Sequence, residues 1–434
     1  MGKNEIFAIL RDWNFWFQEM ETGITRNLYL SSLRRLLPTS NVLVITGVRR
    51  SGKSFLMRQL AKSLTEEGVK KEEILIINFE DPRFIDLNVN LLSKIYEAYL
   101  EILRPARKPY IFLDEVQKVK GWESWVRSIQ ERQAAKIVIS GSNSQILSRE
   151  LGTLLTGRHL DITVYPLAFD EFLSFRGVTI EKEQDLLTKE IIVKGLLREY
   201  LTWGGFPEVV LREPKKEILL TYFEDISLRD LAKRYKIIKT EKLRQLAKFY
   251  LSNFASPITF NALEKSLGLT ADTIEKFSGY LENAYLTIFL KRFSYKTREQ
   301  EKSPRKVYAI DTGLANTVGF QFSENWGRLA ENLVSLALRS TLAEIYYWKD
   351  EKGQEVDFII KEGLKATKAI QVCWQMEDPK TTSRELKGLL KALKELELSE
   401  GIVITEEEER EELIGDKKIK IIPLWKWLIK KEYI

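Results

Sequence analysis

A glycine-rich segment at residues 47–54 constrains the fold of this chain more than any other feature. It reads GVRRSGKS, follows the apolar run NVLVIT and precedes a helical pattern that begins with SFLMRQLAKSL. The spacing GxxxxGK[ST] between an apolar strand and a helix is the context of a phosphate-binding P-loop. Its glycines let backbone amides turn toward phosphates, and the amino terminus of the helix favours negative charge. The segment therefore predicts a strand–loop–helix unit that binds a nucleoside triphosphate.

The loop residues have distinct expected roles. Lys53 is expected to bridge the β- and γ-phosphates, and Ser54 is expected to ligate Mg²⁺. The predicted cofactors are therefore ATP and Mg²⁺. The remaining residues of the predicted nucleotide-binding set are Gly47, Val48, Arg49, Arg50, Ser51, Gly52 and Phe55.

Two acids end a second apolar run further along the chain, where residues 110–115 read YIFLDE. A strand with this ending places Asp114 beside the metal ion and Glu115 where it polarises an attacking water. Either segment alone also fits an ordinary loop or strand end. Together, in this order, they predict ATP hydrolysis.

Further polar residues near the expected sheet are weaker candidates, and each has an ordinary alternative. Asn143 or Ser142, after the strand candidate KIVIS, would sense the γ-phosphate, unless they form a simple loop. Arg158, just before the next strand candidate, would act as an arginine finger on a neighbouring subunit's nucleotide, unless it forms a surface ion pair. Glu80 and Asp81 would hydrogen-bond near the water, although a solvated strand end is the more ordinary interpretation.

The alternation of short apolar runs and helical patterns predicts an α/β fold. The first part resolves into strand candidates that alternate with helices, which is typical of a doubly wound parallel sheet. A length of 434 residues suggests two or three domains. We expect an amino-terminal segment and ATPase domain at 1–177, a helical lid and winged-helix domain at 178–300, and an α/β domain at 301–434.

The middle region predicts a winged helix-turn-helix, with two helices around a turn at 268–270 and the segments KRFSYK and KVYAID as a wing. Phosphate contacts from its basic side chains would give DNA affinity that depends little on sequence. The alternative is a protein-packing module, and the acids of the second helix disfavour reading of the major groove. The residues concerned are Thr270, Asp272, Thr273, Glu275 and Lys276, with Lys265, Lys291, Arg292 and Lys296 as neighbours.

Composition narrows the setting. The chain is 44% hydrophobic and 30% charged, which is typical of a globular protein. No apolar stretch approaches the ~20 residues that span a bilayer, and charges interrupt the amino terminus, so we expect a cytoplasmic protein without membrane contact. One cysteine and one histidine exclude a zinc site built mainly from those residues. The net charge of +6 is compatible with nucleic acid. The Lys- and Glu-rich composition hints at a thermophilic source.

Several segments together resemble archaeal and bacterial AAA+ ATPases whose P-loop carries a double arginine. In the first part these are VRRSGKS, LDEVQKVKGWE, GSNS and GRHLDITVYPLAFDEF. The later ones are GGFP, AIDTGL, GRLAENLV and QEVDFIIK, so the resemblance runs from about residue 23 to residue 374. It is specific as to family, and it fixes architecture better than biology.

The resemblance also implies a carboxy-terminal domain similar to restriction-endonuclease-like nucleases. Such a site needs an acid on a helix, an Asp on a strand and an acid-x-Lys on the next strand, converging on Mg²⁺. Glu331 and Asp357 match the first two positions. Gln371 and Cys373 stand where the acid and the lysine are expected. Gln coordinates without charge and Cys cannot supply a cation. Lys365 or Lys368 could replace the missing lysine, but nothing in the sequence requires it, so the resemblance implies a degenerate nuclease-like domain kept for DNA binding or assembly.

Three functions are compatible with these features. The favoured one is a DNA-directed motor in recombination, repair or branch migration, working as a homo-oligomeric ring such as a hexamer with protein partners of DNA processing. The second is an ATP-gated, metal-dependent nuclease. The third is a slow nucleotide switch that acts as a scaffold for protein partners.

Overall fold

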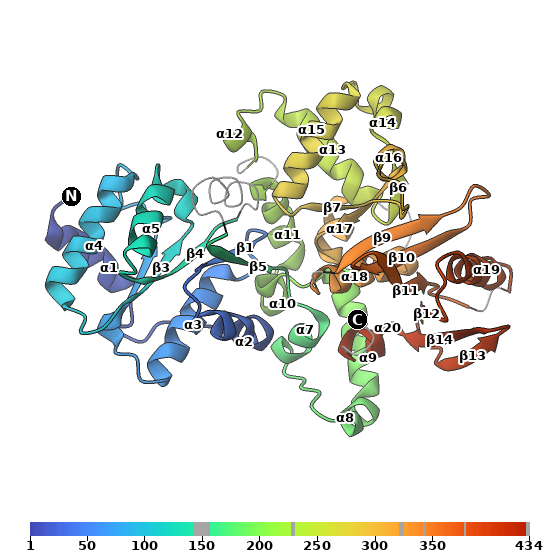
Figure 1. Cartoon of the computed structure of the whole chain (residues 1–434), viewed down its shortest axis with the longest axis horizontal. Helices are drawn as coiled ribbons and strands as arrows, with labels where there is room; N and C mark the ends of the chain where they lie inside the picture. Colours follow the sequence, from blue (N-terminus) through green and yellow to red (C-terminus); the bar gives the residue numbers. More distant parts are fainter. Residues whose placement is uncertain (143–156, 227–230, 321–324, 342, 377–378, 431–434) are drawn as a thin grey trace. The chain divides into compact units, whose positions relative to one another are not determined.

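The computed structural model describes residues 1–142, 157–226, 231–320, 325–341, 343–376 and 379–430 (Figure 1). The chain forms two compact units, Met1–Tyr165 and Pro166–Ile434. Helix α7 (Phe169–Phe175), which the sequence placed in the first domain, lies in the second unit. The division at 177 and 300 stays a prediction. Among the described residues, no helix is both long and apolar enough to cross a bilayer.

The first unit contains a five-stranded parallel sheet with the order β2-β3-β4-β1-β5. This confirms the parallel sheet that the sequence predicts. The order makes the carboxyl ends of β1, β3 and β4 neighbours, and ligands of open α/β sheets bind at that edge. The strands are β1 (Val42–Gly47), β2 (Ile74–Asn78), β3 (Tyr110–Asp114), β4 (Lys136–Ser140) and β5 (His159–Val164).

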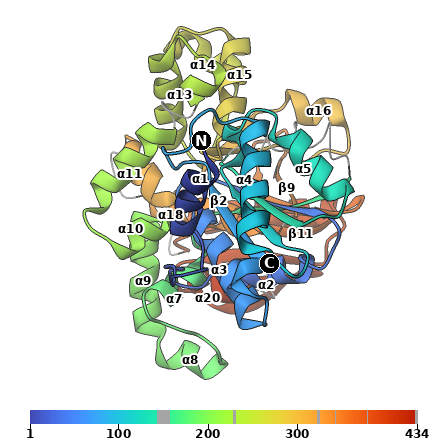
Figure 2. The same ribbon diagram turned by 90° about the vertical axis from the view of Figure 1, so that its left-hand side faces the viewer.

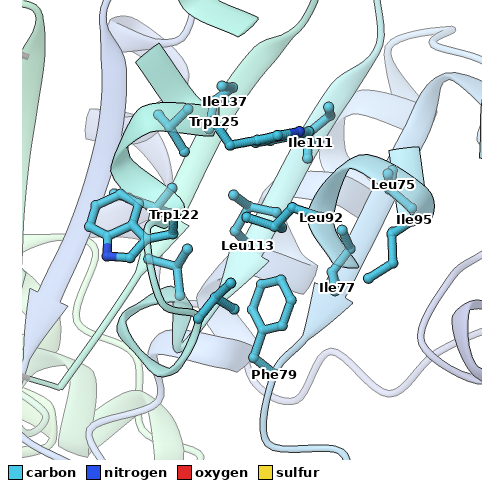
Figure 3. Packing of buried hydrophobic residues seen from close by; sticks show 14 of the residues in the cluster. Leu75, Ile77, Phe79, Leu92, Ile95, Ile111, Leu113, Trp122, Trp125 and Ile137 are labelled. Atoms are coloured by element: carbon cyan, nitrogen blue, oxygen red, sulfur yellow. The ribbon is translucent and has the colours of Figure 1, made fainter. Parts of the chain in front are cut away.

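Alternate residues of each central strand face two separate apolar layers. In β1, Val42 and Val44 belong to one buried cluster, whereas Leu43 and Ile45 belong to the other. Burial on both faces explains why these strands are continuous apolar runs. Figure 3 shows part of the first cluster, which includes the fully buried Trp122.

Helices cover both faces of this sheet. On the face of the first cluster, α4 contacts both α1 and α5 (Figure 2), and on the other face α2 packs against α3. The helices are α1 (Lys3–Asp12), α2 (Asn27–Leu36), α3 (Lys53–Glu66), α4 (Val89–Leu103) and α5 (Trp122–Glu131).

The amino-terminal segment covers the outer edge of the sheet at β2. The Asn14 side chain accepts a hydrogen bond from the Ile76 amide at 2.7 Å and donates to the Ile76 carbonyl at 2.9 Å. The Trp16 indole donates to the Ile74 carbonyl at 2.8 Å. An edge strand exposes unpaired backbone groups that invite pairing with other chains. These side chains satisfy part of that edge from within the molecule.

The second unit begins with a helical region. Its buried α17 packs against α9, α11 and α13. The helices of this region are α7, α8 (Glu183–Thr188), α9 (Glu190–Trp203), α10 (Pro207–Leu211), α11 (Lys215–Glu224), α12 (Leu231–Tyr235) and α17 (Thr312–Val318).

Asp311 joins two distant turns of this region. Its carboxylate accepts hydrogen bonds from the Gly205 amide at 2.7 Å and the Leu314 amide at 2.9 Å. Gly204 adopts φ +75°, and a Cβ there would lie 2.1 Å from Asp311 Oδ1. The glycine pair of the GGFP segment therefore lets the backbone approach a buried acid. Burial raises the pKa of Asp311 to about 6, although backbone N–H groups favour its charged form.

The difference in the free energy of unfolding between the wild type and Asp311→Asn is expected to become smaller as pH rises. The folded state holds the Asp311 proton more tightly than the unfolded state, so this stabilisation is full below about pH 4 and is lost toward about pH 6. Two pKa units correspond to about 3 kcal/mol, and the asparagine does not titrate. At low pH the variant is expected to be less stable than the wild type. The side-chain NH₂ of the asparagine would face one of the two backbone N–H groups, of Gly205 or Leu314, that donate to Asp311. Denaturant unfolding at about pH 4.5 and about pH 7.5 measures this difference. The exposed Asp272→Asn is the control, and a difference that widens with pH contradicts the interpretation.

A three-stranded antiparallel sheet and four helices follow. The strand order is β6-β8-β7. KVYAID supplies β8 as expected, whereas β7 ends at Leu290, before KRFSYK, because the buried run TIFL provides the strand. The elements are α13 (Thr240–Ser252), β6 (Ser256–Ile258), α14 (Phe260–Leu267), α15 (Ala271–Asn283), β7 (Thr287–Leu290), α16 (Thr297–Lys302) and β8 (Arg305–Ala309).

The carboxy-terminal region is a six-stranded mixed sheet with the order β13-β14-β12-β11-β10-β9. β9, β10 and β11 pair antiparallel, and β11, β12 and β14 pair parallel. α19 covers an apolar cluster on one face of this sheet. The elements are α18 (Trp326–Arg339), β9 (Glu344–Lys349), β10 (Glu355–Glu362), β11 (Lys365–Val372), α19 (Pro379–Glu395), β12 (Glu400–Thr405), β13 (Arg410–Ile414), β14 (Lys417–Pro423) and α20 (Leu424–Ile429).

Candidate functional site

The predicted P-loop connects the end of β1 to the start of α3. Gly47 ends the strand with φ +137°, and a Cβ there would lie 2.1 Å from the Val164 carbonyl oxygen of β5. Only glycine fits this approach. Gly52 and Arg50 also adopt positive φ, at 95° and 69°. The loop is thus a tight turn between a buried strand and a helix amino terminus.

Lys53 lies inside this loop. Its ammonium donates hydrogen bonds to the carbonyls of Gly47 at 3.1 Å and Val48 at 2.9 Å, and the residue is buried. Burial lowers the pKa of Lys53, and the carboxylates of Glu115 and Asp114 partly oppose that shift. The cation is therefore held in the concavity of the loop, where phosphates bind in P-loops.

Arg26 supports the loop from the amino-terminal segment. Its guanidinium donates to the Ser51 carbonyl at 2.8 Å and the Tyr165 carbonyl at 3.0 Å. The Gln59 side chain of α3 accepts from the Arg26 amide at 3.1 Å and so fixes this segment against the P-loop helix. The sequence analysis missed Arg26, because a single arginine far from the motif carries no local signal.

Asp114 lies at the carboxyl end of β3, next to the end of β4. It is buried and accepts hydrogen bonds from the hydroxyls of Ser140 and Ser54. Burial and the neighbouring Glu115 raise the pKa of Asp114. The contact with Ser54 unites the two predicted metal ligands, and a hydroxyl with a carboxylate is an oxygen donor set that Mg²⁺ accepts. Ser140 is a second residue that the sequence analysis missed.

Glu115 turns out of β3 with a left-handed φ of 52°. Its amide donates to Ser140 Oγ at 3.2 Å, and its carboxylate accepts from Gln117 and, at 3.3 Å, from Ser142. The structure thus brings Ser142 to Glu115. Asn143, the other candidate phosphate sensor, lies outside the described residues.

The acids after β2 have different surroundings. Glu80 pairs with Lys118 at 2.8 Å and with Arg49 of the P-loop at 3.5 Å. Asp81 is buried between Arg83 and the Trp13 indole, and Arg83 lowers its pKa strongly. Asp81 therefore holds the amino-terminal segment, whereas Glu80 lies beside the P-loop.

Arg158 precedes β5, so it lies at the amino ends of the parallel strands, opposite the P-loop. Its side chain is 57% exposed and its guanidinium lies 3.6 Å from the Glu131 carboxylate. The ordinary alternative of a surface ion pair is thus present in the single chain. The position rules out contact with the nucleotide of the same subunit.

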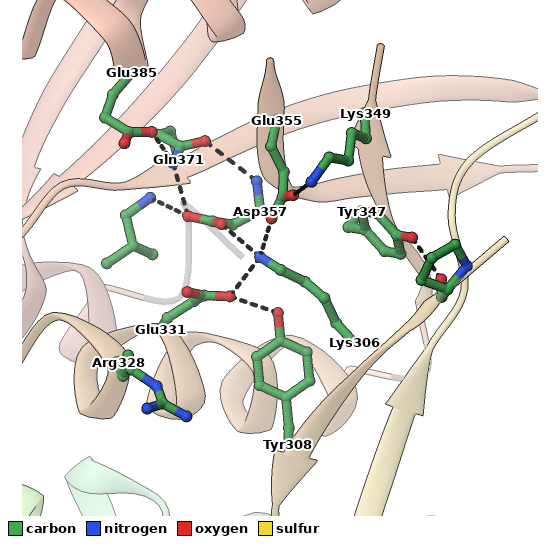
Figure 4. Close-up of polar contacts among 12 residues, drawn as sticks. Lys306, Tyr308, Arg328, Glu331, Tyr347, Lys349, Glu355, Asp357, Gln371 and Glu385 are labelled. Carbon is green, nitrogen blue, oxygen red and sulfur yellow. Dashed lines mark hydrogen bonds and ion pairs between the residues drawn. The ribbon is translucent and has the colours of Figure 1, made fainter. Parts of the chain in front are cut away.

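Three of the four predicted nuclease-like residues meet in a buried cluster of the second unit (Figure 4). Glu331 on α18 and Asp357 on β10 both contact the Lys306 ammonium, each at 2.8 Å. Gln371 on β11 donates to Asp357 at 2.9 Å. Cys373 instead belongs to the apolar cluster under α19, and burial raises the pKa of its thiol to about 11.

The basic residues predicted around α15 are partly engaged within the chain. Lys291 pairs with Glu301 at 2.5 Å and Lys296 with Glu299 at 3.0 Å. The Arg292 guanidinium donates to the Lys349 carbonyl. Lys265 and Lys276 are exposed. Thr270 caps α15 by accepting from the Thr273 amide.

Comparison with known proteins indicates the class of domain to which the first unit belongs. A family model described as an AAA domain matches residues 39–173. Two models described as domains of unknown function, DUF8612 and DUF4143, match residues 194–325 and 326–427. Together with the parallel sheet and the loop, the first match defines a P-loop ATPase domain of the AAA type.

The relatives extend over nearly the whole chain. The uncharacterized protein MJ1544 of Methanocaldococcus jannaschii is 34% identical, over 91% of this chain and 89% of its own length. An uncharacterized protein of Haemophilus influenzae is 32% identical, over 83% of this chain and 88% of its own length. The chain belongs to the family of these two proteins. A solved structure, the Walker-type ATPase PABY2304 of Pyrococcus abyssi, matches 68% of this chain and 96% of its own with 12% identity and a TM-score of 0.42.

Proposed function

We propose that this protein hydrolyses ATP at the carboxyl edge of its first sheet and uses the cycle to act on DNA as a cytoplasmic AAA+ motor. The observation that carries the proposal is the meeting of the P-loop with the end of β3. There Ser54 donates a hydrogen bond to Asp114, and the carboxylates of Asp114 and Glu115 lie close enough to Lys53 to raise its pKa against the effect of burial.

The residues divide the work by their chemistry. The loop amides and Lys53 bind and orient the phosphates, and Ser54 and Asp114 are the residues that would hold Mg²⁺. A bound Mg²⁺ ion supplies neutralisation of phosphate charge. Glu115 takes the proton of the attacking water, while Ser142 and Gln117 orient its carboxylate. Arg49, paired with Glu80 at 3.5 Å, places a further cation at the loop.

A homo-oligomeric ring, such as a hexamer, would give Arg158 a role. Since Arg158 lies at the opposite edge from its own P-loop, it reaches a nucleotide only in a neighbouring subunit. Arg158→Ala is therefore the variant that tests the ring, with turnover measured above and below the concentration at which the protein assembles. A loss of turnover confined to the assembled state supports a finger, and an equal loss in the monomer contradicts it.

The DNA part of the proposal rests on the module from α13 to β8. The order helix, strand, two helices, strand, short helix, strand, with the sheet order β6-β8-β7, supports a winged helix whose last two strands are joined through α16. The exposed Lys265 and Lys276 on α14 and α15 are suited to phosphate contacts. Exposed acids such as Asp272 favour contact with the backbone over reading of bases.

The deciding experiment measures ATP turnover with and without single-stranded, duplex and four-way-junction DNA, alongside light scattering for the oligomeric state. Stimulation by one DNA form is expected, and it should weaken in a Lys265→Ala, Lys276→Ala double variant and fall as salt rises. Lys216→Ala, an exposed lysine outside this module, is the control. If the protein is a monomer and DNA does not change its rate of ATP turnover, the result contradicts the proposed DNA motor and favours a nucleotide switch.

A further inference from the structure

One lysine occupies the centre of the carboxylate cluster in the second unit. Lys306 on β8 places its Nζ 2.8 Å from an oxygen of each of Glu331, Glu355 and Asp357. Its side chain is 3% exposed. Tyr308, two residues along the same strand, donates to the same Glu331 oxygen at 2.7 Å. Figure 4 shows the ammonium surrounded by the three acids.

The far side of Asp357 is also satisfied within the chain. Its Oδ2 accepts from Gln371 Nε2 at 2.9 Å and from the Val372 amide at 3.0 Å. Gln371 Nε2 also donates to Glu385 at 2.7 Å, while Gln371 Oε1 accepts from the Asp357 backbone amide at 3.2 Å. These partners fix the amide orientation, with its N–H groups toward the carboxylates. Both carboxylate oxygens of Asp357 therefore accept hydrogen bonds from donors within the chain.

A divalent ion, which the nuclease-like resemblance implies here, does not fit these residues. Mg²⁺ needs oxygen lone pairs directed to one point at about 2.0–2.1 Å. The point between Glu331, Glu355 and Asp357 is taken by an ammonium, and the position of the expected acid presents an amide N–H group instead. Within the described ranges, no group of three or more His, Cys, Asp or Glu side chains is arranged to hold a metal ion.

We propose that Lys306 is a built-in cation that takes the place of the metal ion, so that the centre ties β8 to α18 and β10 and carries out no hydrolysis. This inference goes beyond the proposed ATPase function and does not depend on it. Burial alone would lower the pKa of Lys306, but Asp357 and Glu331 raise it well above its usual value, so the side chain keeps its charge. Breaking a buried ion pair by removing one partner is strongly destabilising, because the remaining charge has no counterion.

The test uses the full-length, nucleotide-free protein in an Asp114→Asn background, which removes the charged one of the two predicted metal ligands of the first unit. Mn²⁺ binding is followed by electron paramagnetic resonance, and unfolding is followed by calorimetry. The parent is expected to bind no Mn²⁺ at the cluster. Lys306→Met is expected to lower the unfolding temperature of the second unit by on the order of 10 °C and to recover part of it when Mn²⁺ is added.

Lys349→Met is the matched control, because Lys349 contacts only Glu355 of the three acids, at 2.9 Å, and is 37% exposed. Its unfolding temperature is expected to change by less than about 3 °C. Mn²⁺ bound by the parent and lost on Asp357→Asn would overturn the proposal, and so would an unchanged unfolding temperature of Lys306→Met. If Lys306→Met does not fold, the parent titration still decides. Supercoiled plasmid is expected to stay intact with Mn²⁺, and nicking that Asp357→Asn abolishes would also overturn it.

Discussion

Glu115→Gln is expected to bind MgATP as the wild type does and to turn it over about 10²- to 10⁴-fold more slowly, the range that one general acid–base group contributes. Glutamine keeps the shape of the side chain and can still contact Ser142 and Gln117, but it cannot take a proton from water. Unhydrolysed ATP should therefore stay on the protein. Turnover is measured as ADP release, and trapped nucleotide is identified after gel filtration.

Glu80→Gln is the informative control, because Glu80 is an acid at the same edge of the sheet. Although burial raises its pKa, Lys118 and Arg49 lower it below the ordinary value overall, which makes Glu80 a poor proton acceptor. We expect its turnover to change by no more than about tenfold, through Arg49. Normal turnover in Glu115→Gln combined with a large loss in Glu80→Gln would show that Glu80, and not Glu115, is the general base.

Lys53→Ala is expected to weaken MgATP binding by on the order of 100-fold, since hydrogen bonds to charged groups contribute about 1.5–3 kcal/mol. The buried ammonium already carries a desolvation cost, as its lowered pKa indicates. Removing it is therefore expected to change the unfolding temperature of the nucleotide-free protein little. Titration calorimetry measures the affinity, and a parallel melting curve separates lost binding from lost folding.

Lys62→Ala serves as the control for this change, because Lys62 lies on the same helix α3, more than two turns from its amino terminus. Its affinity for MgATP should match that of the wild type. An equal weakening in both variants would mean that the helix, and not the ammonium, determines binding.

The arrangement of the P-loop beside the acids after β3 was largely predictable because its signals are local. The loop at 47–54 and the acids after YIFL each announce a strand end within a few residues, and a parallel sheet must bring such ends to one edge. Ser140 and Arg26 were not predictable, since neither a serine ending a strand nor an arginine in an amino-terminal segment differs from its ordinary counterparts. The role of Ser140 comes from the strand order, which places β4 between β1 and β3. The role of Arg26 comes from the contact of the amino-terminal segment with the P-loop and α3.

The carboxylate cluster was predictable only in part. Glu355 precedes Asp357 by two residues, so the alternation of a strand alone places both on one face. Lys306 gave no signal, because it lies in a separate motif 51 residues before Asp357. The nuclease-like pattern lacks its lysine at Cys373, and the nearby Lys365 and Lys368 were the candidates to replace it. The lysine of the folded protein arrives from another sheet.

The position of Lys306 has a consequence for dividing the protein. The two family models of the second unit meet between residues 325 and 326, so that boundary separates Lys306 from all three acids that surround it. A fragment that starts there would bury Glu331 and Asp357 with no ammonium between them, while Glu355 would keep only Lys349. The two unpaired carboxylates would have to take up protons or be exposed to water. The smallest self-sufficient carboxy-terminal piece therefore begins upstream of β8. The recognisable sequence module is shorter than the unit that can fold.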